Sequence, residues 1–174
     1  MNKINIIITH KCNLMCKHCY MNAGNMDFEE TNIIFSKFKC VIQKIKEMGV
    51  KEIMLTGGEC TISPIFFEML EYCKKNKIKP TVFTNGFTFD KKIINYVDDY
   101  CLSLDGLEDN HNYLRGTPKG FKKTIDTIKY LQQKGKNVTI QVTVTERNLS
   151  EILDIIDLLN SLKIKNINLC CLLD

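Results

Sequence analysis

Three features that would place the protein in a special environment are absent from the sequence. No run of apolar residues approaches the roughly 20 needed for a helix to cross a bilayer, so we expect no membrane span. No secretory signal precedes the first apolar segment, and the nine cysteines are an odd number, which argues against a disulfide framework. We therefore expect a cytoplasmic protein whose thiols stay reduced.

A large excess of one charge is also absent. The chain of 174 residues carries 24 Lys and Arg against 20 Asp and Glu, which gives a formal net charge of +4. A nucleic-acid surface would need basic residues interleaved with exposed aromatics on one element, and no such arrangement is visible. Nucleic acid is therefore not an expected partner. Because repeats, low-complexity segments and linkers are lacking too, residues 1–174 are expected to form one domain.

What the sequence does contain is a regular alternation of two apolar patterns. Short runs typical of strands occur at residues 4–8, 51–56, 80–84, 100–105, 138–145 and 166–171. Apolar residues at helical spacing predict helices at 27–48, after Ser63-Pro64, at 90–97, around 121–131 and at 149–162. A helix between two strands returns the chain to the same end of the sheet, so the strands should be parallel. The predicted fold is α/β, a partial (β/α)6 barrel that ends at the sixth strand.

Distinctive short sequences follow four of these predicted strands. They are Cys12 to Tyr20, Gly57-Gly58-Glu59, Asn85-Gly86 and Asp105-Gly106. Because the carboxyl ends of parallel strands meet at one rim, and ligands bind there, the four sequences should surround one site. The fifth strand alternates polar and apolar residues, which a ligand-filled lumen would explain; the alternative is a strand at an edge of the sheet that faces solvent.

Three cysteines, Cys12, Cys16 and Cys19, leave the end of the first strand together. On a loop of this length, three thiols can reach one soft metal centre. Three thiolates would leave one iron of a cubic iron-sulfur cluster open to a cofactor or a substrate. The alternative is a structural zinc site, in which His10 or His18 completes a Cys3His tetrahedron.

The cysteine spacing resembles the motif Cys-x3-Cys-x-(aromatic)-Cys of the radical SAM superfamily. The resemblance implies that Cys12, Cys16 and Cys19 bind a [4Fe-4S] cluster, and that S-adenosylmethionine chelates its fourth iron. His18 stands where the family usually has Tyr, Phe or Trp, so it would lie on the cofactor side of the loop. Gly57-Gly58-Glu59 resembles the GGE motif of the same family, which receives the methionine amino group of the cofactor.

The segment after the fourth strand resembles the peptide- and protein-modifying branch that includes anaerobic sulfatase maturases. The resemblance implies that Ser103 and Asp105 approach the ribose or methionyl part of the cofactor, and that Arg115 pairs with its carboxylate. Asn85 also occupies a familiar cofactor position, although it could equally be a turn residue. Cys60 replaces the proline that commonly follows GGE, and it is a candidate to face the site and donate a hydrogen atom.

The resemblance as a whole implies a radical SAM enzyme. A one-electron donor such as flavodoxin or ferredoxin would reduce the cluster, and the 5'-deoxyadenosyl radical made from S-adenosylmethionine would abstract hydrogen from a peptide or protein. The alternatives are an enzyme acting on a small molecule or activating a glycyl-radical enzyme, and a non-catalytic module whose metal holds a binding surface. We expect no sixth helix and no cysteine-rich extension, so either the chain is a truncated piece, or a partner or a second copy covers the edge near Cys170 and Cys171.

Overall fold

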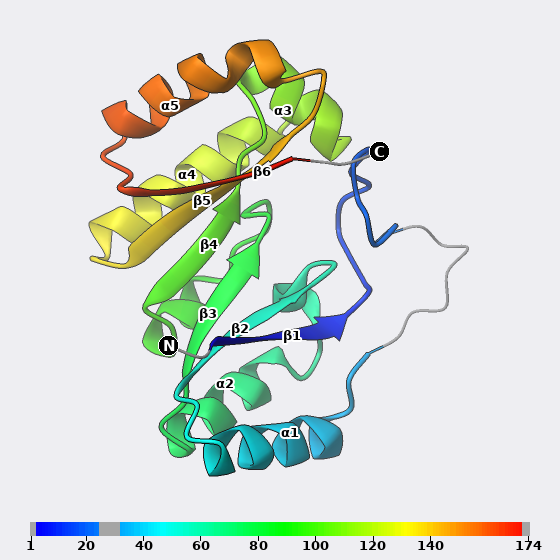
Figure 1. The fold of residues 1–174 in the computed structure, drawn as a ribbon, viewed down its shortest axis with the longest axis vertical. Coiled ribbons are helices and arrows are strands. Elements are labelled where there is room, and N and C mark those ends of the chain that lie inside the picture. Colours follow the sequence, from blue (N-terminus) through cyan, green and yellow to red (C-terminus); the bar gives the residue numbers. More distant parts are fainter. Residues whose placement is uncertain (1–2, 25–31, 172–174) are drawn as a thin grey trace.

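The computed structural model describes residues 3–24 and 32–171. This part of the chain forms one six-stranded sheet with helices around it (Figure 1). The strands are β1 (Lys3–Thr9), β2 (Glu52–Gly57), β3 (Lys79–Thr84), β4 (Asp99–Ser103), β5 (Asn137–Val144) and β6 (Asn166–Cys171). The helices are α1 (Phe35–Glu47), α2 (Phe66–Lys75), α3 (Glu108–Arg115), α4 (Gly120–Gln133) and α5 (Ile152–Ser161). Short 3₁₀ helices lie at Cys60–Ile62, Lys91–Asn95 and Leu149–Glu151.

The strands lie in the sheet in the order of the sequence, and every pairing between them is parallel. Ile6 of β1 aligns with Leu55 of β2, and at the other side Ile140 of β5 aligns with Ile167 of β6. Among the described residues β1 and β6 pair with no further strand, so the sheet is open. The predicted α/β class and the partial barrel of six parallel strands are confirmed.

The hydrophobic core lies between the sheet and the helices that cover it. Leu55 of β2 and Ile140 of β5 are fully buried there, against a layer that includes Phe38 of α1 and Leu131 of α4. Burying one such side chain stabilises the fold by about 2 kcal/mol. The polar residues that alternate with these aliphatics on β5, such as Gln141, are only half-buried and face the other way. The predicted two-faced pattern of β5 is therefore confirmed.

The predicted helices and the observed ones differ at four places. The helix expected at 90–97 is only the short 3₁₀ helix Lys91–Asn95. α1 begins at Phe35, because Asn32 pairs with the backbone of Thr9 instead of extending the helix. Residues 27–31 of the predicted helix lie outside the described residues. Ser63 does not cap α2, since the helix begins after Ile65 and the Ser63 hydroxyl has no hydrogen-bond partner in the described chain. The sequence pattern does not predict α3 at all.

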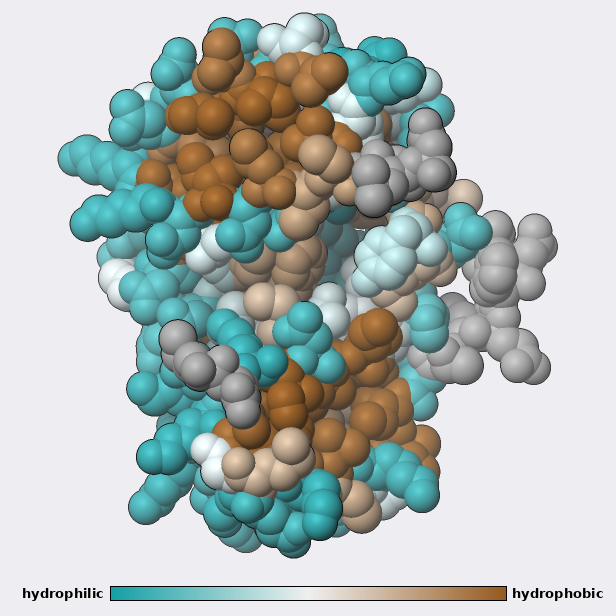
Figure 2. Space-filling model, in the orientation of Figure 1, coloured by the Kyte–Doolittle hydropathy of each residue, from teal (hydrophilic) through white to brown (hydrophobic). Residues whose placement is uncertain are grey.

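Apolar side chains gather in two areas of the face shown in Figure 2, one over α5 and β6 and one over β1. Exposed apolar residues in these elements include Leu153 of α5, Leu169 of β6 and Ile7 of β1. Both edge strands of the open sheet thus carry apolar surface. None of the helices in the described ranges is long and apolar enough to span a bilayer.

Candidate functional site

A cavity of about 130 Å³ lies at the carboxyl ends of the strands. The ends of several strands and the loops after them form its wall. The lining residues include Cys12, Cys16, His18, Cys19, Gly57, Gly58, Asn85, Ser103, Arg115, Gln141 and Thr143. The structure therefore brings most of the predicted site residues together at one rim. A larger hollow of about 650 Å³ lies at the opposite ends of β3 to β5, and none of the predicted residues lines it.

The glycines after β2 hold the cysteine loop in place. The amide of Gly58 donates to the Thr9 carbonyl at 2.8 Å, and the amide of Glu59 donates to the Lys11 carbonyl at 2.8 Å. A Cβ atom on Gly57 would lie 2.3 Å from the Thr9 oxygen, and one on Gly58 would lie 2.3 Å from the Lys11 oxygen. Both glycines are therefore required by the close approach of two stretches of the chain itself, in addition to lining the cavity.

The far side of the cysteine loop rests on the last turn of α3. The amide of Lys17 donates to the Leu114 carbonyl at 2.8 Å. Gly116, which ends the helix at φ 67°, lies so close that a Cβ atom there would be 2.6 Å from the Met15 oxygen. The loop is thus clamped between the end of β2 and the end of α3, and its course is fixed by backbone contacts on both sides.

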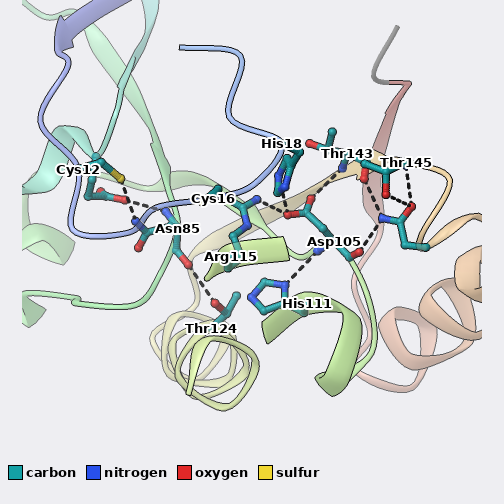
Figure 3. A network of polar contacts seen from close by, with 12 residues as sticks. Cys12, Cys16, His18, Asn85, Asp105, His111, Arg115, Thr124, Thr143 and Thr145 are labelled. Carbon is teal, nitrogen blue, oxygen red and sulfur yellow. Dashed lines mark hydrogen bonds and ion pairs between the residues drawn. The ribbon is translucent and has the colours of Figure 1, made fainter. Parts of the chain in front are cut away.

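Asp105 is the centre of a buried polar network next to this loop (Figure 3). Its Oδ2 atom lies 2.5 Å from a terminal nitrogen of Arg115 and 3.2 Å from Nε2 of His18, while Oδ1 accepts a hydrogen bond from the Thr143 amide at 2.8 Å. Burial alone would raise the pKa of Asp105, but Arg115 and His18 hold the pKa of this carboxyl well below its usual range. The carboxylate is therefore charged at neutral pH.

Arg115 connects Asp105 to the cysteine loop. Its other terminal nitrogen lies 3.7 Å from the Cys16 sulfur (Figure 3). The Arg115 side chain is 11% exposed and its Nε atom has no hydrogen-bond partner within the described residues, as is also true of His18 Nδ1. Unpaired buried polar atoms are costly, and both side chains line the cavity, so a polar ligand there would complete their hydrogen bonding. This is the feature of the site that fits S-adenosylmethionine.

Glu59 lies behind the cavity wall and does not line it. Its carboxylate accepts hydrogen bonds from the hydroxyl and amide of Thr61, from the Thr84 hydroxyl at 2.8 Å and from the Asn85 amide at 2.8 Å. Burial raises the pKa of Glu59. The side chain amide of Asn85 donates to the side chain of Asn13 in the cysteine loop at 2.8 Å. Glu59 thus supports the loop after β3, and that loop in turn supports the cysteine loop.

The three thiols of the loop face the cavity without converging on one point. No group of three His, Cys, Asp or Glu side chains in ranges 3–24 and 32–171 is arranged to hold a single metal ion. A structural zinc ion needs its thiolates at about 2.3 Å from one centre, whereas in a [4Fe-4S] cube each thiolate binds a different iron. Burial raises the pKa of the Cys12 thiol to about 11, so only a cationic metal centre would hold this sulfur as a thiolate. Three thiols on one loop beside the cavity are the donor set that such a cluster needs.

Two residues outside the predicted set complete the network. His111 of α3 accepts a hydrogen bond from the Asp105 amide through Nδ1 at 3.1 Å, and burial lowers its pKa to about 3, so the ring is neutral. Asn148 donates to the Asp105 and Thr143 carbonyls at 2.6 and 2.8 Å and joins the ends of β4 and β5. Both residues occur in the predicted loops, but only the fold shows their partners.

Cys60 does not face the cavity as the sequence suggested. It is fully buried in the hydrophobic core, and its thiol donates to the Phe83 carbonyl at 3.1 Å. Burial raises the pKa of this thiol well above its ordinary value. The correction has a physical reason: the 3₁₀ helix that starts at Cys60 turns this side chain under the sheet, away from the rim.

Comparison with known proteins agrees with this geometry. The family model of the radical SAM superfamily matches residues 6–159. The sporulation killing factor maturation protein SkfB of Bacillus subtilis is 30% identical over 155 residues, which are 86% of this chain and 37% of SkfB. The subtilosin biosynthesis protein AlbA of the same organism is 34% identical over 155 residues, 84% of this chain and 34% of AlbA. The chain thus spans little more than a third of these relatives.

The fold is shared with solved structures. The crystal structure of Streptococcus suis SuiB bound to S-adenosylmethionine superimposes with a TM-score of 0.83 at 24% identity, and covers 99% of this chain and 41% of SuiB. The match of the family model to most of the chain, the six parallel strands and the three thiols at their rim all lead to one conclusion. The chain belongs to the radical SAM superfamily.

Proposed function

We propose that this chain is the core of a radical SAM enzyme that modifies a peptide or protein. The observation that carries the proposal is the cavity that gathers Cys12, Cys16 and Cys19 beside the unpaired buried nitrogens of Arg115 and His18. Three thiolates would hold a [4Fe-4S] cluster, and the cavity beside them would hold S-adenosylmethionine. When bound, these two groups supply reductive cleavage of the sulfonium and a 5'-deoxyadenosyl radical that abstracts hydrogen from the substrate.

The residues of the chain have separate roles in this proposal. Arg115 binds the cofactor carboxylate through its free Nε and is held in place by Asp105. The backbone of Gly57 and Gly58 receives the cofactor amino group, while the buried carboxylate of Glu59 adds negative potential from behind. Ser103 lines the cavity from the end of β4, at the place proposed for the ribose.

Asn85 lines the same cavity and helps to fix the position of the cysteine loop. Among the cavity residues, Gln141 and Thr143 of β5 give the lumen a polar wall. These side chains would orient the reacting groups, and the enclosing loops would keep water away from the radical.

A peptide substrate is supported by the relatives. SkfB is a maturation protein, AlbA acts in bacteriocin biosynthesis, and SuiB has been crystallised with its precursor peptide SuiA. The alternative of a small-molecule substrate is supported by the Fe-coproporphyrin III synthase of Methanosarcina barkeri, which is 28% identical over 165 residues, 92% of this chain. The enzyme would need a one-electron donor such as flavodoxin or ferredoxin, and a partner or second copy at the exposed β6 edge also stays a prediction.

The test is anaerobic reconstitution with iron and sulfide, followed by addition of S-adenosylmethionine and dithionite. We expect about four irons per chain, a spectrum that changes when the cofactor is added, and formation of 5'-deoxyadenosine. Cys16→Ala should abolish all three, whereas Cys40→Ala, which removes an exposed thiol on α1, should change none of them. Bound zinc, or a cluster that ignores the cofactor, would instead support a non-catalytic binding module.

The substrate class is tested by the same assay with added substrates. A peptide that increases 5'-deoxyadenosine formation and leaves with altered mass would support the proposed class. Stimulation by an iron porphyrin alone would favour the small-molecule alternative.

A further inference from the structure

An exposed patch beside the cysteine loop carries two cations stacked on one tyrosine. The Lys17 ammonium lies 4.3 Å from the centre of the Tyr113 ring, and the Arg147 guanidinium lies 3.8 Å from it. The side chains of Lys17, Tyr113 and Arg147 are exposed. Neighbouring Met15 is 67% exposed. We call these four residues, Met15, Lys17, Tyr113 and Arg147, the stacked patch.

The stacked patch comes from three segments that meet only in the fold. Met15 and Lys17 flank Cys16 in the cysteine loop, Tyr113 lies in the last turn of α3, and Arg147 follows β5. The hydrogen bond from the Lys17 amide to the Leu114 carbonyl fixes the loop against α3 at this point. The patch is therefore the outer surface of the wall whose inner side presents Cys16 to the cavity.

Three of the four residues in the patch are of types that are typical of a protein interface. Tyr, Met and Arg are enriched at the centres of interfaces, where they bury large areas. Stacking on Tyr113 favours fixed positions for the Lys17 ammonium and the Arg147 guanidinium. Backbone contacts already hold the cysteine loop, so the three thiols do not need the contacts of the stacked patch to keep their positions. Binding of a partner protein would account for the patch.

We infer that the stacked patch is the docking site of an acidic one-electron carrier protein. The inference rests on the function proposed above, because only a redox cluster held by Cys12, Cys16 and Cys19 needs such a partner. Two fixed positive charges complement an acidic protein surface, and an apolar and aromatic centre between them gives contact area. With a cluster held by Cys12, Cys16 and Cys19, one electron would pass from the reduced carrier to it; the carrier would be oxidised and the cluster reduced, with no bond formed or broken.

A short-lived redox complex does not need a large interface. Such complexes bury small areas and depend on charge to bring the partners together. Asp109 precedes Tyr113 by four residues on α3, and Glu146 precedes Arg147, so carboxylates border the patch. The two cations over the Tyr113 ring supply its positive charge.

The test compares two ways of reducing the reconstituted chain. One uses dithionite, a small chemical reductant, and the other uses reduced bacterial flavodoxin, an acidic one-electron carrier. In the variant Lys17→Glu/Arg147→Glu we expect 5'-deoxyadenosine formation with flavodoxin to fall about tenfold at low salt, while formation with dithionite stays unchanged. Raising the salt concentration should slow the flavodoxin reaction of the unchanged protein and have less effect on the variant.

The matched control is Lys37→Glu/Lys39→Glu on α1. Lys39 also lies over an aromatic ring, that of Phe35, but α1 and α3 lie at opposite ends of the long axis of the molecule (Figure 1). This control should keep both activities. Titration calorimetry of flavodoxin against each protein gives a readout that does not depend on turnover, and only the stacked-patch variant should bind about tenfold more weakly.

The outcomes separate the docking site from the proposed function. An unchanged flavodoxin reaction, or an equal loss in the control variant, would overturn the docking site. Equal losses with dithionite and with flavodoxin would show that the variant damages the cysteine loop, and would overturn it as well. The milder variant Lys17→Gln/Arg147→Gln, which adds no repulsion, should reproduce a smaller loss with flavodoxin alone. If the unchanged protein makes no 5'-deoxyadenosine with dithionite, the proposed function itself fails.

Discussion

Replacing Asp105 by Asn should destabilise the protein strongly, because within the described residues its carboxylate forms the ion pairs of two largely buried side chains, Arg115 and His18. The Asp105 side chain is fully buried, and those of Arg115 and His18 are 11% and 8% exposed. Asn keeps an acceptor for the Thr143 amide but removes the charge that faces the guanidinium at 2.5 Å. Breaking a buried ion pair in this way typically costs about 3–5 kcal/mol, because an unpaired buried charge is left behind.

The loss can be measured by urea unfolding of the metal-free, reduced protein at pH 7.5. A domain of this size has an m-value of about 2 kcal/mol/M, so the midpoint should fall by about 2 M. The control is Lys122→Gln, which breaks the exposed ion pair with Asp126, where the side chains are 77% and 59% exposed. That change should cost less than about 0.5 kcal/mol. A shift for Asp105→Asn as small as that of the control would refute the reasoning.

The same experiment has a pH dependence with a defined sign. The folded pKa of Asp105 lies below its unfolded value, which is about 3.9. The carboxylate therefore contributes its full stabilisation above about pH 5 and loses it as pH falls through 4 toward the folded pKa. The difference between the unchanged protein and Asp105→Asn should be constant from pH 5 to 8 and should shrink below pH 4. A double variant with Arg115→Gln should cost less than the sum of the single changes.

Two further predictions concern the supports of the site. His111 is neutral because its pKa is about 3 against an ordinary value of 6.5, so the unfolded state binds its proton first and stability falls as pH drops through this range. Between pH 7 and pH 5 this residue should lower the free energy of unfolding by about 2 kcal/mol. In His111→Asn, the urea midpoint should therefore change less over this pH range than in the unchanged protein. Gly58→Ala would place a Cβ 2.3 Å from the Lys11 carbonyl, so thermal unfolding should show a loss of more than ~2 kcal/mol and cluster incorporation should fall. Gly135→Ala, with φ 67° and open space around it, should cost only about 1 kcal/mol and leave the cluster intact; equal costs would contradict the steric argument.

The fold was predictable because its strands and most of its helices bury apolar residues at regular spacing. α3 lacks such a stripe: of its eight residues only His111 and Leu114 are buried, and His111 is there to bind the Asp105 backbone. Periodicity could not predict the start of α1 either, because Asn32 pairs with Thr9 of β1, which is distant in the sequence. Local pattern predicts elements that pack on the core, and it fails where an element serves the site.

The members of the site were predictable from strand ends, but their partners were not. Parallel strands place Cys12, Asn85 and Ser103 at one rim whatever the side chains do. The contact between Arg115 and Cys16 joins residues 99 positions apart, and no local pattern signals it. Cys60 shows the opposite error, because proximity in sequence to Gly57-Gly58-Glu59 suggested a shared site, whereas the turn at η1 (Cys60–Ile62) buries it in the core.

The histidine at position 18 is the clearest departure from the family motif, and the structure gives it a partner. A buried imidazole without partners would cost free energy, but Nε2 of His18 lies against the Asp105 carboxylate that also holds Arg115. A buried charge network of this kind is seldom the most stable solution, since apolar residues of similar volume stabilise a fold as well or better. A non-catalytic module, in which the metal only stabilises a binding surface, would gain nothing from this charge network. The network has a use where Arg115 and His18 must present polar atoms to a bound cofactor, and this favours the enzyme over the non-catalytic module.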